Sequence, residues 1–189
     1  MTPRLITPKR HGDARGWLAE VYQAERYARL GVDAVFVQDN HSYSQSAGVL
    51  RGLHFQLPPH AQAKLVRCVR GAIWDVVADI RRGSPTYGRW VAATLSADNG
   101  HQVFAPIGYA HGFLTLAADT EVEYKASAVY SPASEGGVVW NDPDLAIAWP
   151  LHGTEPTLSA KDADLPSFAD LESPFAYDGA PLAPLEPAA

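Results

Sequence analysis

The sequence predicts an all-β protein, a sandwich or barrel of short antiparallel strands with a few short helices. Between residues 33 and 150 apolar and polar residues alternate as they do in strands, and Gly, Pro, Asn or Asp interrupts them about every eight to twelve residues. The 15 Gly and 15 Pro residues spread along the chain favour tight turns. Helical periodicity is scarce. It predicts one short helix over 25–30, ended by Gly31, and a second after Ser159.

The segment 72–80 shows the strand alternation most clearly. Its apolar residues share one face, and they are Ala72, Trp74, Val76, Ala78 and Ile80. Asp75 and Asp79 point to the other face. A carboxylate that points into a pocket helps to fix the protonation state of a neighbouring basic group. Both aspartates are therefore candidate partners of Lys64 or His111.

The segment 122–130 alternates in the same way and is predicted to form one strand. It places Tyr124 and Tyr130 on one face with small residues between them. The space beside the rings fits a pocket wall, and it fits equally well a core face that happens to include tyrosines. An ideal strand would separate the two tyrosines by about 20 Å.

The chain length predicts a single domain over 1–189, because 189 residues suffice for one hydrophobic core. We expect that core to lie within about 13–162. From Glu172 onward Pro and Ala dominate, which predicts a tail over 172–189 that follows the surface or frays.

Charge and hydropathy exclude several classes of partner. The net charge of −6 disfavours a nucleic-acid groove, which is normally basic. The sequence contains no apolar run suited to a signal peptide or a membrane span, so we expect a cytoplasmic protein without a membrane partner. Cys68 is the one cysteine of the chain, and its apolar neighbours predict a buried, inert thiol rather than a nucleophile.

The stretch 48–71, GVLRGLHFQLPPHAQAKLVRCVRG, carries the strongest functional signal. It places Arg51, His54, Lys64 and a second arginine among strand-forming aliphatic residues. A buried strand rarely contains so many polar and basic side chains unless they have a function. The stretch predicts a pocket that binds an anion and moves a proton.

Two motifs of the cupin barrels are each matched in part. The second motif, G-x5-P-x-G-x2-H, is present in GHQVFAPIGYAHGFLT (100–115), but Thr115 replaces the asparagine that ends it. In the first motif Gly48 and His54 fit, but Gln56 stands at the second histidine and the glutamate is absent. Two imidazoles beside neutral amides bind a divalent ion poorly, so we expect no metal. The barrel resemblance remains, and it makes His54 and His111 candidate bases instead of ligands.

Seven motifs in order along the chain resemble one cupin family, the dTDP-4-dehydrorhamnose 3,5-epimerases of L-rhamnose biosynthesis. They are DARGWLAE (13–20), VQDNHS (37–42), VLRGLHFQ (49–56), QAKLVRCVRGAIWDVVADIRRGSPTYGRW (62–90), PIGYAHGF (106–113), WNDPDLAIAWP (140–150) and LSAKD (158–162). Each alone is a weak signal, and their order and spacing carry the resemblance. The fold that it implies is the cupin-type jelly roll.

The resemblance implies a reaction that inverts the two carbons beside the C4 ketone of dTDP-4-dehydro-6-deoxy-D-glucose, without a cofactor. The product is dTDP-4-dehydro-L-rhamnose. By resemblance His54 is the general base, and Asp162 is the carboxylate that orients it. Tyr124 is the acid on the opposite face of the sugar, and Lys64 is the cation beside the enolate oxygen.

Further positions match the substrate-binding residues of the family. Arg15, Arg51 and Lys161 match positions that face the nucleotide or its diphosphate, and Tyr130 matches the residue that stacks on the thymine. The other matching contacts are Glu20, Gln38, Asp39, Asn40, Gln56, His111 and Glu135. Family members are homodimers that exchange strands. The resemblance therefore implies a homodimer in which the N-terminal segment, with Arg15 and Glu20, is shared between subunits.

Two other functions are open at this point. A relative that inverts only C3 or only C5 would keep His54 and the nucleotide-binding residues, and would differ in the pocket near Tyr124 and Tyr130. A non-catalytic cupin that binds a sugar nucleotide would lack the base, its carboxylate or the acid. All three of those positions are filled here.

Overall fold

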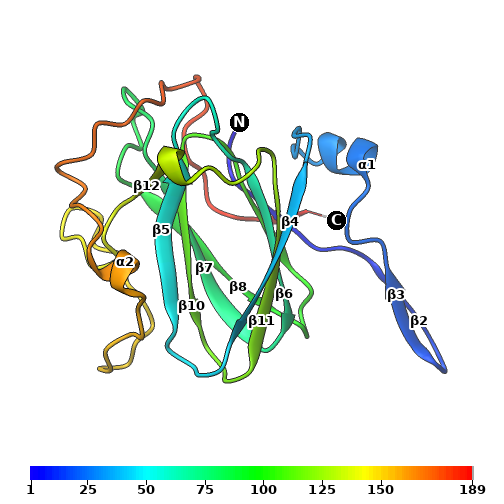
Figure 1. Ribbon diagram of the computed structural model, residues 1–189. Helices are drawn as coiled ribbons and strands as arrows, with labels where there is room; N and C mark the ends of the chain where they lie inside the picture. Colours follow the sequence, from blue (N-terminus) through cyan, green and yellow to red (C-terminus); the bar gives the residue numbers. More distant parts are fainter. Residues whose placement is uncertain (189) are drawn as a thin grey trace.

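The computed structural model describes residues 1–188, which form two facing β-sheets with two short α-helices at their periphery (Figure 1). The strands of the first half are β1 (Arg4–Ile6), β2 (Arg10–Asp13), β3 (Gly16–Ala19), β4 (Gln38–Ser44), β5 (Leu50–Gln56), β6 (Lys64–Arg70) and β7 (Ala72–Asp79). Those of the second half are β8 (Trp90–Ser96), β9 (Gln102–Ala105), β10 (Tyr109–Thr115), β11 (Thr120–Ala126), β12 (Glu135–Gly137) and β13 (Pro187–Ala188). The helices are α1 (Ala24–Arg29), the 3-10 helix η1 (Pro132–Ser134) and α2 (Ala160–Ala163).

The strand order is that of a jelly-roll sandwich. One sheet has six strands in the order β13-β1-β9-β6-β11-β4, and the other has five in the order β12-β5-β10-β7-β8. Their pairings are antiparallel except where β13 joins β1. Because most neighbours in a sheet are not consecutive in sequence, the chain crosses repeatedly from one sheet to the other. The predicted all-β jelly-roll sandwich is confirmed.

Buried hydrophobic residues form three clusters, and two of them cover the faces of the smaller sheet. The layer between the sheets contains Val66 and Val103 from the larger sheet and Val77 from the smaller one. The outer face of the smaller sheet is covered by the chain after β12, whose Trp149 and Phe168 pack with residues of β7. Both faces of β7 are therefore buried, with the alternation predicted from the sequence.

Both predicted helices are present, and side chains at their first residues stabilise them. The Gln23 side chain accepts a hydrogen bond from the Arg26 N–H at 2.6 Å, and α1 ends before Gly31, whose φ of 87° suits glycine. Ser159 caps α2 by accepting from the Asp162 N–H at 3.1 Å. The cap at Ser159 fixes where Asp162 stands.

The predicted strand over 122–130 is shorter than expected, because β11 ends at Ala126. Beyond it the Tyr130 N–H donates to the Gln38 side chain at 2.8 Å instead of to a neighbouring strand. Pro132, which has no N–H to donate, then begins η1. Tyr124 and Tyr130 consequently lie on a strand and on a loop, and the prediction of one continuous strand is wrong.

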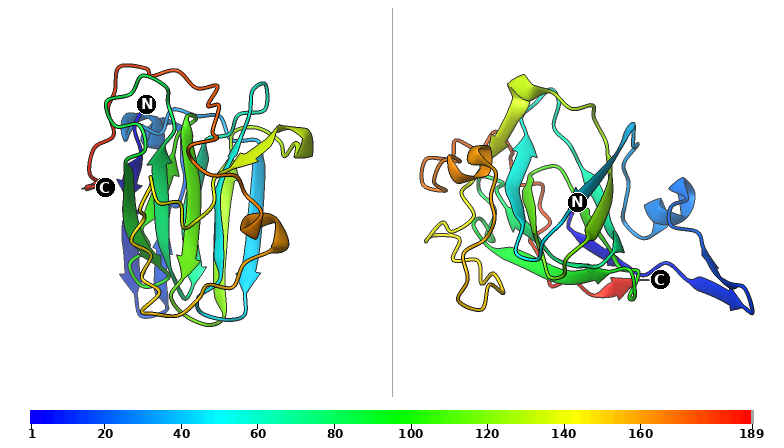
Figure 2. Two further views of the ribbon diagram at one scale, coloured as in Figure 1. Left: turned by 90° about the vertical axis from the view of Figure 1, so that its left-hand side faces the viewer. Right: turned by 60° about the horizontal axis from the view of Figure 1, so that its bottom comes forward.

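The hairpin β2–β3 projects away from the sandwich (Figure 2). Its two strands pair with each other and, within residues 1–188, with no other strand. Trp17 is 59% exposed and Leu18 is 76% exposed. An isolated two-stranded hairpin is only marginally stable, so its apolar residues call for a partner surface.

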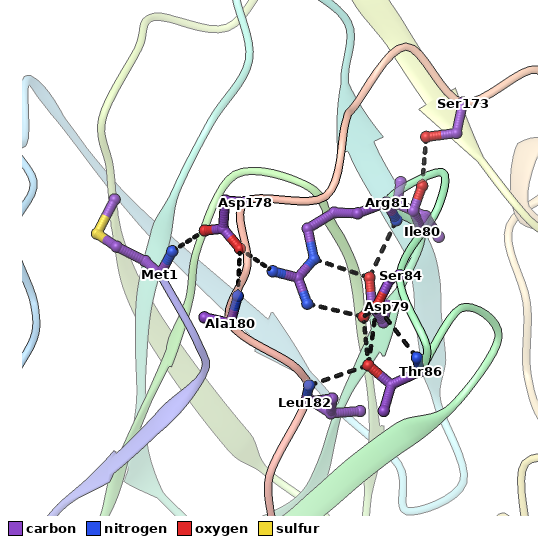
Figure 3. A network of polar contacts seen from close by, with 10 residues as sticks. All are labelled: Met1, Asp79, Ile80, Arg81, Ser84, Thr86, Ser173, Asp178, Ala180 and Leu182. Atoms are coloured by element: carbon purple, nitrogen blue, oxygen red, sulfur yellow. Dashed lines mark hydrogen bonds and ion pairs between the residues drawn. The ribbon is translucent and has the colours of Figure 1, made fainter.

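The C-terminal segment follows the surface as far as it is described. The Arg82 N–H donates to the Phe175 carbonyl at 2.8 Å, and the end of the segment joins the larger sheet as β13. A buried arginine cluster holds its middle part (Figure 3). Arg81 donates to both oxygens of Asp79 at 2.9 and 2.7 Å, and to Asp178 at 2.7 Å. Asp79 is thus bound to Arg81, and the expectation that it partners Lys64 or His111 is wrong.

No helix among residues 1–188 has the length and apolar character needed to cross a membrane.

Candidate active site

A cavity of about 260 Å³ lies between the two sheets, and all four predicted catalytic residues line it. Its walls are Ser42, Arg51, His54, Lys64, His111, Phe113, Tyr124, Ser159, Lys161 and Asp162. The strands β5 and β10 bring the two histidines together, because His54 and His111 are direct partners across that pair. Lys64 on β6 and Tyr124 on β11 come from the opposite sheet.

His54 and Asp162 form a hydrogen-bonded pair. The His54 Nε2 and the Asp162 Oδ1 are 2.5 Å apart, although 108 positions separate the residues in sequence. Burial raises the pKa of the Asp162 carboxyl, but the hydrogen bonds from His54, Ser159 and the Gly52 N–H lower it overall. Asp162 is therefore ionised, and it leaves the His54 Nδ1 as the ring nitrogen that can take a proton.

Close approach of two strands makes this arrangement possible. Gly52 has a φ of 125°, and a Cβ added there would lie 2.6 Å from the Gly112 Cα. Only glycine combines this positive φ with so close an approach to Gly112, and it lets β5 come near β10. The Gly52 N–H then donates a hydrogen bond to Asp162. The backbone is thus part of the histidine–aspartate pair.

Lys64 and Tyr124 face the histidine from the other sheet. Burial lowers the pKa of Lys64 to about 8, an effect that the charges of Asp75 and Glu135 oppose. Burial raises the pKa of Tyr124, so its phenol is protonated at neutral pH. The Lys64 Nζ lies 6.0 Å from the centre of the Tyr124 ring. A cation and a neutral proton donor therefore stand across the cavity from a base.

His111 has a carboxylate partner of its own. Its Nε2 lies 2.8 Å from the Asp75 Oδ2, and the Asp75 side chain is fully buried. The expectation that an inward carboxylate of β7 meets His111 is confirmed for Asp75.

A second cavity, of about 110 Å³, adjoins the first and shares His54, Lys64 and Tyr124 with it. Its other walls are Gln38, Asn40, Phe55, Gln56, Gln62, Tyr130 and Glu135. Glu135 forms an ion pair with Lys161 and a hydrogen bond with Tyr130. Burial raises the pKa of Glu135, and these two contacts lower it overall. This second cavity contains most of the remaining residues that the sequence predicts to bind substrate.

Three predicted residues lie away from both cavities. Arg15 and Glu20 belong to the projecting N-terminal segment, where the Arg15 side chain is 90% exposed and bound to Asp13. Asp39 points to the outer face of β4, where it pairs with Lys125 at 2.9 Å. A hollow of about 300 Å³ on that face is lined by the ion pairs Asp39–Lys125 and Arg67–Glu123, and it also touches Asn40 and Tyr124.

Ser159, Ser42 and Phe113 line the cavity but were not predicted as site residues. Ser159 is detectable from the sequence, because Ser159 and Asp162 have the spacing of a helix cap followed by an acidic third residue. Ser42 and Phe113 carry no comparable signal, since polar and aromatic residues alternate along many strands.

Comparisons with known proteins identify the family of the chain. A family model described as dTDP-4-dehydrorhamnose 3,5-epimerase matches residues 3–170. The chain belongs to that family. A relative of that name from Sinorhizobium fredii is 49% identical over 174 residues, which cover 92% of this chain and 89% of the relative.

Two solved structures of epimerases superpose on most of the chain. A Legionella pneumophila dTDP-6-deoxy-D-glucose-3,5-epimerase in complex with dTDP-4-keto-L-rhamnose has a TM-score of 0.85 and 46% identity, and the match covers 90% of this chain and 89% of that one. A 3'-monoepimerase from Streptomyces bikiniensis in complex with dTDP-quinovose has a TM-score of 0.82 and 40% identity, covering 88% of this chain and 84% of that one.

Proposed function

We propose that this chain inverts C3 and C5 of dTDP-4-dehydro-6-deoxy-D-glucose to give dTDP-4-dehydro-L-rhamnose. The observation that carries the proposal is the His54–Asp162 pair at 2.5 Å in a cavity that also holds Lys64 and Tyr124. The similarity to an epimerase in complex with dTDP-4-keto-L-rhamnose supports the choice of substrate.

The chemistry is a proton exchange next to a ketone. The His54 Nδ1 takes the proton from the carbon beside the C4 carbonyl, and Asp162 stabilises the imidazolium that forms. The electron pair of the broken C–H bond moves to the C4 oxygen, where the Lys64 ammonium stabilises the enolate. Tyr124 then donates its phenolic proton to the opposite face of the carbon. Exchange with water returns the proton to Tyr124 and removes the one on His54.

The nucleotide would occupy the outer part of the site. Arg51 and Lys161 provide cations for the diphosphate, and Tyr130, which is 53% exposed, offers a ring face for the thymine. The remaining proposed contacts are Gln38, Asp39, Asn40, Gln56, His111 and Glu135. No metal or cofactor enters this reaction, and the cytoplasmic location remains a prediction.

A homodimer would complete the site. The projecting hairpin exposes Trp17 and Leu18, and neither Arg15 nor Glu20 lines the two cavities of its own chain. The strand β4 is the edge of the larger sheet, and within residues 1–188 no strand pairs with its outer side. The hairpin of a second copy, packed near that edge, would bring its arginine to the nucleotide and cover its apolar residues.

Proton NMR in D2O with dTDP-4-dehydro-6-deoxy-D-glucose tests the function. We expect deuterium at both C3 and C5, and its loss in a folded His54→Ala variant that still binds dTDP, because the base is gone. His60→Ala, on the loop after β5, is the matched control and keeps wild-type exchange. Deuterium at one carbon alone would assign the chain to the mono-epimerases, to which it is also similar. No exchange in wild-type protein would contradict an epimerase acting on this substrate.

A further inference from the structure

Asp75 is a buried carboxylate that the reaction outlined above does not use. It lies on β7, between β10 and the edge strand β8, with no exposed surface, so no substrate atom can touch it. Its Oδ2 meets the His111 Nε2 at 2.8 Å, and its Oδ1 has no hydrogen-bond partner among residues 1–188. A buried carboxylate oxygen without a partner is costly, which indicates a role other than packing.

Lys64 is the second group that interacts with the Asp75 carboxylate. Burial raises the pKa of Asp75, and the contact with His111 and the charge of Lys64 oppose this rise. Among residues 1–188 no carboxylate lies within ion-pair distance of the Lys64 amine, whereas the other carboxylates of the site are engaged. Asp162 is bound to His54, and Glu135 is bound to Lys161. Lys64 and His111 line the same cavity, and Asp75 lies behind His111, so the charge of Asp75 favours the ammonium form of Lys64 without an ion pair.

We propose, building on the epimerase function proposed above, that Asp75 is a positioning residue that keeps Lys64 charged and free to meet the enolate oxygen, while it also fixes the ring of His111. A direct ion pair would hold Lys64 charged but would occupy the donors that the oxyanion needs. A carboxylate beyond contact distance supplies the charge and leaves the donors available. One buried side chain thereby acts on two residues of the cavity wall, Lys64 through its charge and His111 through a hydrogen bond.

The charge of Lys64 responds to every ionisable group around the cavity. Asp75 on β7 and Glu135 on β12 favour the ammonium form, and burial opposes it, so that the pKa of Lys64 is lowered to about 8. The other titratable or charged groups facing it are Arg51, His54, His111, Tyr124 and Lys161. Loss of the Asp75 charge removes one of the two groups that raise this pKa, so the ammonium form would be lost at a lower pH.

The test is the pH dependence of kcat in Asp75→Asn, which keeps the size of the side chain and an oxygen acceptor for His111. We expect the alkaline limb of the profile to move down by about one pH unit, and kcat at pH 8 to fall roughly fivefold from the smaller protonated fraction alone. The KM and the affinity for dTDP remain as in the wild type. Asp79→Asn, on the same strand and face, is the matched control: it lowers the melting temperature and leaves the profile in place.

A second readout does not depend on turnover. The rate of reductive methylation of Lys64, followed by mass spectrometry against pH, reports the fraction of neutral amine and shifts to lower pH in Asp75→Asn. An unchanged alkaline limb or an unchanged Lys64 titration in folded Asp75→Asn would overturn the proposal. A wild-type protein that does not turn over the sugar nucleotide would instead contradict the proposed function, and the lysine titration would still decide the role of Asp75.

If Asp75→Asn does not fold, Lys64→Arg tests the same claim in the wild-type background. The guanidinium stays protonated over the whole range, so the alkaline limb near pH 8 should disappear. A limb that persists in Lys64→Arg belongs to another group, and this result would overturn the proposal.

Discussion

Asp75 and Asp79 lie on the same face of β7, yet the two carboxylates have opposite surroundings. Both oxygens of Asp79 accept hydrogen bonds, from Arg81, Ser84 and Thr86. One oxygen of Asp75 accepts from His111, and the other has no partner among residues 1–188. One short strand thus contributes one carboxylate whose two oxygens are both hydrogen-bonded and one carboxylate with an oxygen that is not. The arrangement at Asp79 stabilises the fold, and the arrangement at Asp75 leaves a buried carboxylate oxygen without a partner among the described residues.

In the cluster around Arg81 every charged group has a partner of opposite charge. Arg81 is 2% exposed, and its guanidinium lies 4.4 Å from the Tyr109 ring centre and 5.3 Å from that of Tyr177. Burial raises the pKa of Asp79, but the hydrogen bonds from Arg81 lower it overall. Because the folded pKa is depressed, this carboxylate contributes stability above its ordinary pKa, and the contribution is lost as the pH falls through the folded value.

The cluster in the cavity contains a cation, Lys64, that is not in an ion pair within the described residues. Burial alone would favour the neutral form of Lys64. Such an arrangement opposes folding, since a buried charge without a close partner is unfavourable. It is suited to a reaction that creates a negative charge next to the lysine, because the enolate then supplies the missing partner.

The largest effect on stability is expected from Arg81→Met. It leaves Asp79 and Asp178 without their cation, so the free energy of unfolding should fall by about 3–5 kcal/mol. Turnover per folded molecule should stay unchanged. Urea unfolding measures the first quantity and initial rates below the melting transition measure the second. Arg82→Met, at the exposed neighbouring position, is the control, and a loss for Arg81→Met no greater than for Arg82→Met would contradict the account.

A smaller effect, on activity alone, is expected from Tyr124→Phe. The variant removes the proposed acid but keeps the ring, and turnover should fall by about 100-fold. The melting temperature should change little, because within residues 1–188 the Tyr124 hydroxyl makes no hydrogen bond. Tyr43→Phe removes an exposed hydroxyl on β4 and should keep full activity. Wild-type turnover in Tyr124→Phe would remove this residue from the mechanism.

Features encoded by neighbouring residues were predictable from the sequence. The alternation over 72–80 predicted β7 with its two aspartates on one face, and Gly31 and Ser159 marked the helix ends. Local patterns failed where a distant side chain competes with the strand ladder. Gln38 captures the Tyr130 N–H, and no pattern within 122–130 reveals this contact.

Pairings between distant residues were not predictable from pattern alone. The expectation of Asp162 behind His54 came from the family resemblance, because the two residues meet only after the chain has crossed between the sheets. Asp75 and Asp79 were indistinguishable in sequence. Their different roles follow from the turn after β7, which places Arg81 beside Asp79, and from β10, which places His111 beside Asp75.

The same substitution at two buried cations tests the contrast most directly. Burial lowers the pKa of Lys64 from 10.5 to about 8, so between these values the unfolded chain binds more protons and this residue makes stability rise with pH. Lys64→Met should therefore raise the free energy of unfolding at pH 7 by about 1–2 kcal/mol while turnover falls by about 100-fold. Arg81→Met should change both quantities in the opposite pattern, with stability lost and turnover kept. A Lys64→Met protein that is less stable than the wild type, or equally active, would contradict the account.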